Sequence, residues 1–433
     1  MTTIAQVAQA LQELLGARAT ELERTSGFVQ RTSKLTGSAF LQTLVFGWLA
    51  NPEATLEELS QVAVLLGVAI TSQGLDQRFT PQAAEFLKQV LAAAVQAVVA
   101  SEPMALPVLQ RFAGVYLLDG TTVTLPEALA EVWDGGGCPA ALKVQVGLEM
   151  RTGQLLGPLL QAARDQDRTT PLQEAELPVG ALRLADLGYF DLQRLQSLSV
   201  QRAFWLTRLQ AGTLVFTPDG QRQDLLALLE AQRSNTVDLS VEVGVKQRLS
   251  CRLIAQRVPA EVAEERRRKL RAAARHKGQT VSQQRLRLAG WTYYITNVPV
   301  ELLSPAEALV LARVRWQIEL LFKLWKSQGC IDHWRSAKPW RILCEVYAKL
   351  VAVLVQHWTL LLGCWMRVDH SLWKAARTIR HLALYLAAHF AEPLACEDAL
   401  RTLARVLAAG CRINKRKTKP HTYQLLIALC EEA

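Results

Sequence analysis

The segment GVYLLDGTTVTLP at residues 114–126 decides the fold, because it opens a strand-rich region in a chain that begins with helices. It is a short apolar run that ends in Asp119 and Gly120. Four further runs have the composition of strands, and DLQRLQSLS at 191–199 has the pattern of a helix. The four runs are KVQVGLEM (143–150), QLLGPLLQAAR (154–164), LRLADLGYF (182–190) and AFWLTRLQ (203–210). Strands interleaved with helices predict an α/β fold with a mixed sheet.

Residues 211–300 interrupt this pattern with three more strands and a very basic helix. The strands are predicted at VDLSVEVG (237–244), RLSCRLIAQRV (248–258) and WTYYITNV (291–298), and the helix at AEERRRKLRAAARHKG (263–278). A long helix is predicted to begin after Ser304 and Pro305 and to continue to about Gly329. The chain after Pro339 and the first hundred or so residues are also helical, since apolar residues recur three and four positions apart.

The composition is that of a folded protein with a basic second half. Half of the 433 residues are apolar and 20% are charged, which excludes a disordered chain. Residues 1–200 carry 13 basic and 20 acidic side chains, whereas residues 201–433 carry 36 and 19, a net charge of +17. This asymmetry favours an anionic partner such as nucleic acid or a membrane surface. Eight scattered cysteines and the lack of a signal-peptide pattern favour the cytosol, and the apolar runs are too short to span a membrane.

The N-terminal helices contain a possible helix-turn-helix. Thr55 can cap a helix that closes at Gly67, and a second helix is predicted to start near Thr71. An ordinary helical hairpin is the alternative, because Gly74 weakens the second helix and the segment is acidic.

Two aspartates share a sequence context. Asp119 and Asp186 each come at the end of an apolar strand, so they would face each other if the strands were neighbours. Each also has a simpler explanation, because Asp119-Gly120 is a hairpin-turn signal and Asp186 with Gly188 could end a strand.

The long helix carries one acid between two bases. At about 100° per residue, Arg315, Glu319 and Lys326 lie within roughly 40° of one another on one face. A solvated ion pair is the alternative. The neighbouring apolar residues Ile318, Leu321 and Phe322 make the helix too apolar to be wholly exposed, which favours a functional site.

These three motifs together resemble a known family. The helix RWQIELLFKLWK (315–326) resembles the Tyr-Arg-Glu-Lys signature of bacterial insertion-sequence transposases of the DDE type. DGTTVTLP (119–126) and DLGYF (186–190) are similar to that family's first and second aspartate motifs. The resemblance spans about residues 112–328, with the strand-rich insertion in the expected place. One position departs from the signature, since Ala312 stands where its tyrosine would fall.

The resemblance implies a ribonuclease-H-like core in which Asp119, Asp186 and Glu319 hold two Mg²⁺ ions, with Mn²⁺ as a substitute. Two hard cations held by carboxylates about 4 Å apart suit phosphodiester cleavage. Arg315 and Lys326 are then placed to bind phosphates of the DNA end. No histidine is required, and His333 is expected to be exposed in a loop.

Two basic segments are predicted to contact DNA phosphates. Seven cations fall between Arg266 and Lys277, and five fall between Arg412 and Lys419. The predicted contacts are Arg266, Arg267, Arg268, Lys269, Lys415, Arg416 and Lys417. A merely solvated helix face is the alternative. Trp291 could stack on an unpaired base, although packing in a core explains it equally well.

Five regions follow from these features. They are a helical region that is a candidate for binding DNA ends (1–105), the first part of the core (106–210), the basic insertion (211–303), the second part of the core with the catalytic helix (304–375) and a C-terminal helical region (376–433).

The expected function is a cut-and-paste transposase of the bacterial cytosol that binds terminal inverted repeats, cleaves them and joins them to target DNA. Its expected partners are double-stranded DNA and a second copy in a synaptic complex, without a membrane. A decayed or non-catalytic DNA-binding protein, or a metal-dependent nuclease that cuts without joining, is the alternative that Ala312 leaves open.

Overall fold

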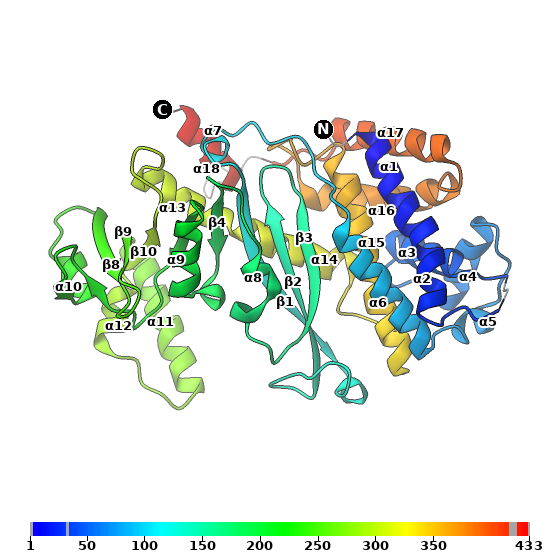
Figure 1. The fold of residues 1–433 in the computed structure, drawn as a ribbon, viewed down its shortest axis with the longest axis horizontal. Helices are drawn as coiled ribbons and strands as arrows, with labels where there is room; N and C mark the ends of the chain where they lie inside the picture. The colour runs from blue at the N-terminus through cyan, green and yellow to red at the C-terminus, as the bar shows by residue number, and fades with distance from the viewer. Residues whose placement is uncertain (1–2, 32–33, 415–421, 432–433) are drawn as a thin grey trace. The chain divides into compact units, whose positions relative to one another are not determined.

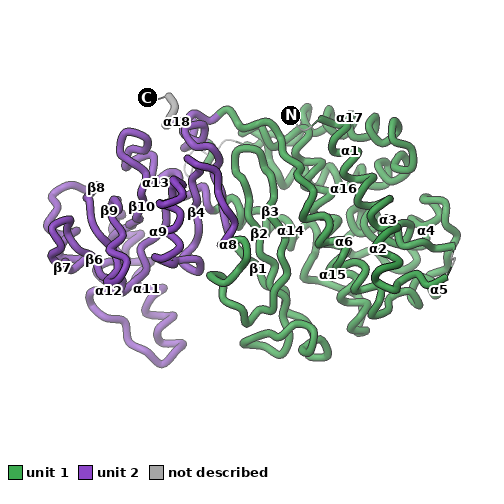
Figure 2. Tube along the Cα trace, in the orientation of Figure 1, with its two compact units in different colours: residues 1–105, 119–172, 316–423 green, residues 106–118, 173–315, 424–433 purple. Residues whose placement is uncertain are grey.

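The computed structural model describes residues 3–31, 34–414 and 422–431. The chain forms two compact units, shown in green and purple in Figure 2. Unit 1 comprises residues 1–105, 119–172 and 316–423, and unit 2 comprises residues 106–118, 173–315 and 424–433. Each unit is therefore assembled from segments that are distant in the sequence. The strand β1 (Val115–Leu125) begins in unit 2 and ends in unit 1.

The N-terminal part of unit 1 is helical, as its periodicity predicts (Figure 1). Its helices are α1 (Ile4–Gln12), the π-helical turn η1 (Glu13–Arg18), α2 (Ala19–Thr25), α3 (Gly37–Ala50), α4 (Leu56–Leu65), α5 (Ser72–Asp76) and α6 (Pro81–Gln96). Threonines begin several of them: Thr36, Thr55 and Thr80 each accept a hydrogen bond from a backbone N–H of the first turn. These side chains fix where the helices start.

The possible helix-turn-helix has the predicted boundaries but a very short second helix. Thr55 caps α4 in a capping box with Glu58, and Gly67 follows the helix with a φ of +82°. Thr71 caps α5, which has only five residues. A helix of little more than one turn is too short to lie along a DNA groove, so the structure favours the alternative of a helical hairpin.

A single long helix forms the centre of unit 1. The helix α15 (Pro339–Leu361) is buried at every position from Ile342 to Leu361, and it packs against α3, α6 and α16 (Leu372–Ala388). The helix α17 (Pro393–Ala409) packs against α1 and α16. Among the described residues, α15 is the one helix long and apolar enough to cross a membrane, and it is entirely buried inside the protein. The core helix of a soluble protein has the same properties, so this is weak evidence for a membrane.

A β-hairpin packs on α15 within the same unit. The strands β2 (Ala140–Glu149) and β3 (Leu155–Ala162) pair antiparallel beside the second half of β1. Trp133 Nε1 donates a hydrogen bond of 2.8 Å to Tyr347 Oη, and the imidazole of His357 lies 2.6 Å from the carbonyl oxygen of Gly153. The N-terminal helices and the hairpin therefore share α15 as a common core.

Unit 2 is built on a mixed sheet. The first half of β1 pairs parallel with β4 (Leu182–Ala185), which pairs parallel with β5 (Phe204–Arg208). The next strand, β10 (Trp291–Thr296), is antiparallel to β5 and to β9 (Leu249–Arg257). The sheet continues through β8 (Thr236–Val243), β6 (Val215–Phe216) and β7 (Arg222–Gln223). The strands of the predicted insertion thus extend the same sheet and share one hydrophobic core with β5.

Helices cover this sheet at several places. Those of unit 2 are α7 (Pro107–Gln110), the 3-10 turn η4 (Leu187–Tyr189), α9 (Leu192–Val200), α10 (Leu225–Glu230), α11 (Ala260–His276), α12 (Gln283–Leu288) and α13 (Pro305–Val314). The remaining elements are η2 (Glu127–Leu129), η3 (Asp167–Thr169), α8 (Pro171–Glu174), α14 (Trp316–Gly329) and α18 (Thr422–Glu431). The mixed α/β class is confirmed.

Candidate active site

Asp119 lies inside a strand. The sequence predicts that the strand ends at Asp119, with a hairpin turn as the simpler explanation, and both expectations are wrong. β1 continues for six more residues to Leu125, since Thr121, Thr122 and Val123 are β-branched and favour extended backbone. The carboxylate of Asp119 is partly buried, and its Oδ1 accepts a hydrogen bond of 2.8 Å from the Gly120 N–H.

Asp186 lies immediately after a strand, as predicted. β4 ends at Ala185, and Asp186 precedes the 3-10 turn η4. In the parallel pair of β1 and β4, Leu118 is opposite Ala185. Asp119 directly follows Leu118 in the sequence, and Asp186 directly follows Ala185.

The predicted long helix is interrupted at Arg315. α13 ends at Val314, Arg315 follows as its C-cap, and α14 begins at Trp316. The guanidinium of Arg315 is 19% exposed, and its Nε lies 4.0 Å from Asp186 Oδ1. A single straight helix is therefore the wrong description of this region, and within unit 2 Arg315 is directed at the second aspartate.

α14 presents Glu319 and Lys326 on one face. They are seven residues apart, which is about −20° on a helix. In unit 1, Lys326 Nζ donates a hydrogen bond of 2.9 Å to the carbonyl oxygen of Thr122 in β1. The face of α14 that carries Glu319 is thus the face that contacts the strand of Asp119. Among the described residues, no group of three or more His, Cys, Asp or Glu side chains lies close enough together to hold a metal ion.

The basic helix α11 has two kinds of cation. Arg266 is half-buried and donates to the carbonyl oxygen of Trp291 (3.1 Å) and to Thr292 Oγ1 (2.9 Å). Burial, with a smaller contribution from Arg208, lowers the pKa of Arg266 from its ordinary value. Arg267 donates to the carbonyl oxygen of Leu286. These two arginines attach α11 to the rest of unit 2.

The other cations of α11 are directed to solvent. Arg268 is exposed, and Lys269 is 72% exposed with an ion pair of 2.7 Å to Glu265. Surface pairs of this kind hold a charge only weakly, so Lys269 remains available to an anionic ligand. The second predicted cluster, with Lys415, Arg416 and Lys417, lies outside the described residues.

A cavity of about 1180 Å³ in unit 2 gathers cations from several elements. Arg266 and Lys269 line it, together with three arginines that no sequence motif indicates: Arg208, Arg222 and Arg285. These three lie on β5, β7 and α12, so no local pattern in the sequence links them. The lining has one carboxylate, Asp224. Trp291 also borders the cavity, but its side chain is 4% exposed in the core, which favours core packing over base stacking.

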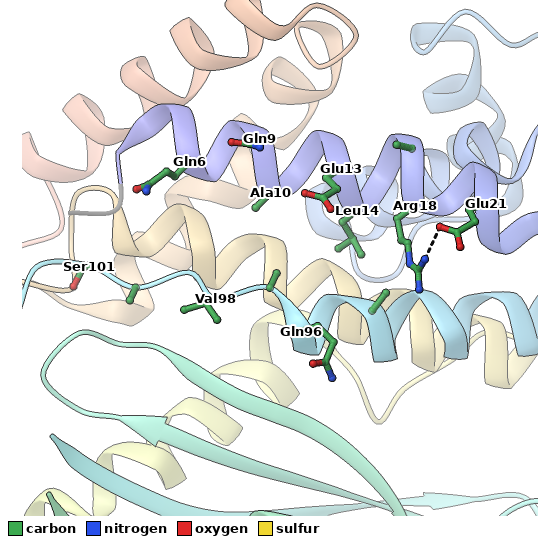
Figure 3. A pocket seen from close by; sticks show the side chains of 14 residues that line it. Gln6, Gln9, Ala10, Glu13, Leu14, Arg18, Glu21, Gln96, Val98 and Ser101 are labelled. Atoms are coloured by element: carbon green, nitrogen blue, oxygen red, sulfur yellow. Dashed lines mark hydrogen bonds and ion pairs between the residues drawn. The ribbon is translucent and has the colours of Figure 1, made fainter. Parts of the chain in front are cut away.

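A second cavity, of about 870 Å³, lies in unit 1 along α1 and η1 (Figure 3). Gln6, Gln9 and Gln96 give it an amide-rich lining, and Arg18 is paired with Glu21. With two glutamates and one arginine, this cavity is less suited to phosphate than the cationic cavity of unit 2.

Comparison with known proteins identifies the family. Residues 110–355 match the model of the transposase DDE domain. The chain is 28% identical over 361 residues to the transposase for insertion sequence element IS231B of Bacillus thuringiensis subsp. berliner, which covers 77% of this chain and 75% of that protein. It is 26% identical over 363 residues to the transposase for insertion sequence element IS1151 of Clostridium perfringens, covering 77% and 76%. The chain belongs to the DDE-type transposases of insertion sequences.

Proposed function

We propose that the protein binds the terminal inverted repeats of its element, cleaves the ends by two-metal-ion phosphodiester chemistry and joins them to target DNA in a cut-and-paste reaction. The family supports a transposase that acts on DNA. The register of β1 and β4 is the single observation that most supports the catalytic assignment. Leu118 is paired with Ala185 in this register, and Asp119 and Asp186 are the residues that directly follow these two in the sequence.

We assign the metal ions to Asp119, Asp186 and Glu319. Carboxylate oxygens are the ligands that Mg²⁺ prefers, and Mn²⁺ accepts the same donors. Glu319 lies on the face of α14 that contacts β1 through Lys326, which supports its inclusion. In this proposal, all three carboxylates act on the same pair of metal ions. The ribonuclease-H-like assignment of the core rests on the family and on the mixed sheet.

The bound ions would supply a nucleophile at neutral pH and neutralise charge on the leaving oxygen. The other roles belong to the side chains of the protein. Arg315, which lies near Asp186, would bind a phosphate oxygen of the DNA end in a bidentate manner, and Lys326 would bind as a point charge. Both cations also hold the negatively charged DNA backbone close to three carboxylates that would otherwise repel it.

We assign the binding surface for the DNA backbone to unit 2. The exposed cations of α11 and the cationic cavity beside it carry positive charge from four elements of this unit. Such surfaces bind phosphates without reading the sequence. Residues 1–105 stay a candidate for reading the end sequence, and a homodimer would hold two ends in one synaptic complex.

A catalytically decayed DNA-binding protein is the second candidate, and Ala312 is the observation that favours it. This residue stands in place of the signature tyrosine on α13, three positions before Arg315. A related nuclease that cuts without joining is the third.

Incubation with labelled end DNA and Mg²⁺ distinguishes the three. Cleavage followed by joining to a target plasmid supports the transposase, and cleavage without joining supports the nuclease. Specific binding without cleavage in either Mg²⁺ or Mn²⁺ supports the decayed copy.

A further inference from the structure

We infer that Gln145, held by Asp167 and Lys143, is a positioning residue for the carboxylate of Asp119. This inference rests on the proposed role of Asp119 as a metal ligand. All four residues lie in unit 1, and only contacts within that unit are involved.

Gln145 supports the backbone next to Asp119. It is a fully buried polar residue in the strand β2. A Cβ atom added to Gly120 would lie 2.9 Å from Gln145 Oε1 and 3.1 Å from its Cδ, closer than real Cβ atoms normally approach. The amide of Gln145 therefore occupies the space that a side chain at residue 120 would need. The same glycine donates its N–H to Asp119 Oδ1 over 2.8 Å.

Asp167 fixes the orientation of this amide. Its Oδ1 accepts a hydrogen bond of 3.0 Å from Gln145 Nε2 and one of 3.0 Å from Lys143 Nζ. Lys143 also donates to the carbonyl oxygen of Asp165. Because a carboxylate only accepts hydrogen bonds, the amide nitrogen must face Asp167, and the amide oxygen is the atom nearest to the added Gly120 Cβ. Lys143 and Gln145 are two residues apart on β2, so they project from the same face of the strand.

The result is a chain of contacts that leads from a charged pair at the surface to the proposed metal ligand. Lys143 is 12% exposed and Asp167 is 37% exposed, so the pair is partly shielded from solvent. Without the hydrogen bond from Gln145 to Asp167, the amide would be less fixed beside Gly120, and the Asp119 carboxylate that accepts from the Gly120 N–H would be more mobile. Groups that orient a metal ligand in this way typically change metal affinity or activity by about 10- to 100-fold when they are replaced.

The test compares Gln145→Leu and Asp167→Asn with wild type. Direct Mn²⁺ binding, measured by the decrease of the free-ion EPR signal, is expected to weaken about tenfold or more in both variants. The Mg²⁺ concentration that half-saturates end cleavage should rise in parallel, while end-DNA affinity without metal and the melting temperature change little. Asp165→Asn is the matched control, because Asp165 takes part through its backbone carbonyl. It should behave as wild type.

A second experiment tests the contact itself. Gly120→Ala should impair metal binding because its new methyl group meets the Gln145 amide. In the Gly120→Ala, Gln145→Ala double variant that contact is absent, so the double variant should bind metal no more weakly than Gln145→Ala alone.

The outcomes distinguish the positioning role of Gln145 from the proposed metal-dependent function. Additive effects in the double variant, or unchanged Mn²⁺ binding in Gln145→Leu and Asp167→Asn, would overturn the inference. Absence of metal-dependent cleavage and of Mn²⁺ binding in the wild type would instead overturn the proposed function.

Discussion

Arg315 has both a structural position and a proposed role in DNA binding. It is the C-cap of α13, and its Nε lies 4.0 Å from Asp186 Oδ1. Arg315→Ala and Lys326→Ala are each expected to slow end cleavage by about ten- to a hundredfold, because a charge-assisted hydrogen bond contributes about 1.5–3 kcal/mol. Arg313→Ala, at an exposed position of α13, is the control. A lower melting temperature with an unchanged rate would assign Arg315 a purely structural role.

Ala312 allows a gain-of-function prediction at the same helix. It lies one turn before Arg315, where the resemblance to the family signature would place a tyrosine. Ala312→Tyr is expected to strengthen binding of end DNA or to accelerate its cleavage, measured by gel shift and by strand nicking. If both stay unchanged in an otherwise active protein, the match to the family signature is looser at this position than the sequence suggests.

The burial of His357 predicts that the stability of unit 1 depends on pH. Complete burial lowers the pKa of its imidazole to about 4, below the ordinary value of 6.5. Between these two pH values the unfolded chain binds the proton and the folded chain does not. The free energy of unfolding should therefore fall by up to about 3 kcal/mol as the pH is lowered from 7 to 4.

The control for this prediction is His357→Gln. Its amide can still donate to the carbonyl oxygen of Gly153, which accepts from His357 in the wild type if Nε2 carries the proton. Urea denaturation at pH 7, 6 and 5 should show a flatter pH dependence for the variant. Equal slopes would show that other groups cause the acid sensitivity.

At the scale of elements, the exposure of the cations on α11 predicts which of them contact DNA. Replacing the exposed Arg268, Lys269 and Arg275 by glutamine should weaken binding to all DNA sequences alike. The negative slope of log K against log salt should become shallower by about 0.9 for each phosphate that the variant no longer neutralises. Arg267→Gln should instead lower the melting temperature, since the guanidinium of Arg267 donates a hydrogen bond to the carbonyl oxygen of Leu286. An unchanged salt slope in the triple variant would make this helix face merely solvated.

The elements also show how far the sequence alone could lead. The longer strands and the helix caps at Thr55 and Thr71 were predictable, because periodicity and capping act over a few residues. The two-residue strands β6 and β7 were not predicted. The sequence also predicted that Asp186 follows a strand. It did not predict that β1 continues through Asp119, because Asp-Gly is a turn signal that sheet pairing can override.

The tertiary contacts were beyond the reach of sequence patterns. Nothing local indicates that Arg266 turns inward to β10, or that Arg208, Arg222 and Arg285 line one cavity. The anchoring of Gln145 by Asp167 joins residues 22 positions apart. These contacts follow from the packing of the whole unit.

At the scale of the whole molecule, the N-terminal helices and α14 pack on the same central helix. α3 and α6 pack on α15, which also packs on α14. Deletion of residues 1–105 should therefore expose a fully buried helix and abolish cooperative folding of unit 1. Thermal denaturation followed by circular dichroism checks this. A truncated chain that melts cooperatively near the wild-type temperature would show that residues 1–105 are an independent domain.

The central claim is that Asp119, Asp186 and Glu319 form one metal-dependent catalytic site for DNA cleavage. The most direct measurement is nicking of end DNA in Mg²⁺ by wild type and by Asp119→Asn, Asp186→Asn and Glu319→Gln, with DNA binding measured in parallel. We predict metal-dependent nicking by the wild type, its absence in each variant, and DNA affinity within about threefold of wild type in all. Nicking that survives any of the three substitutions, or that proceeds at the same rate in EDTA, would contradict the claim.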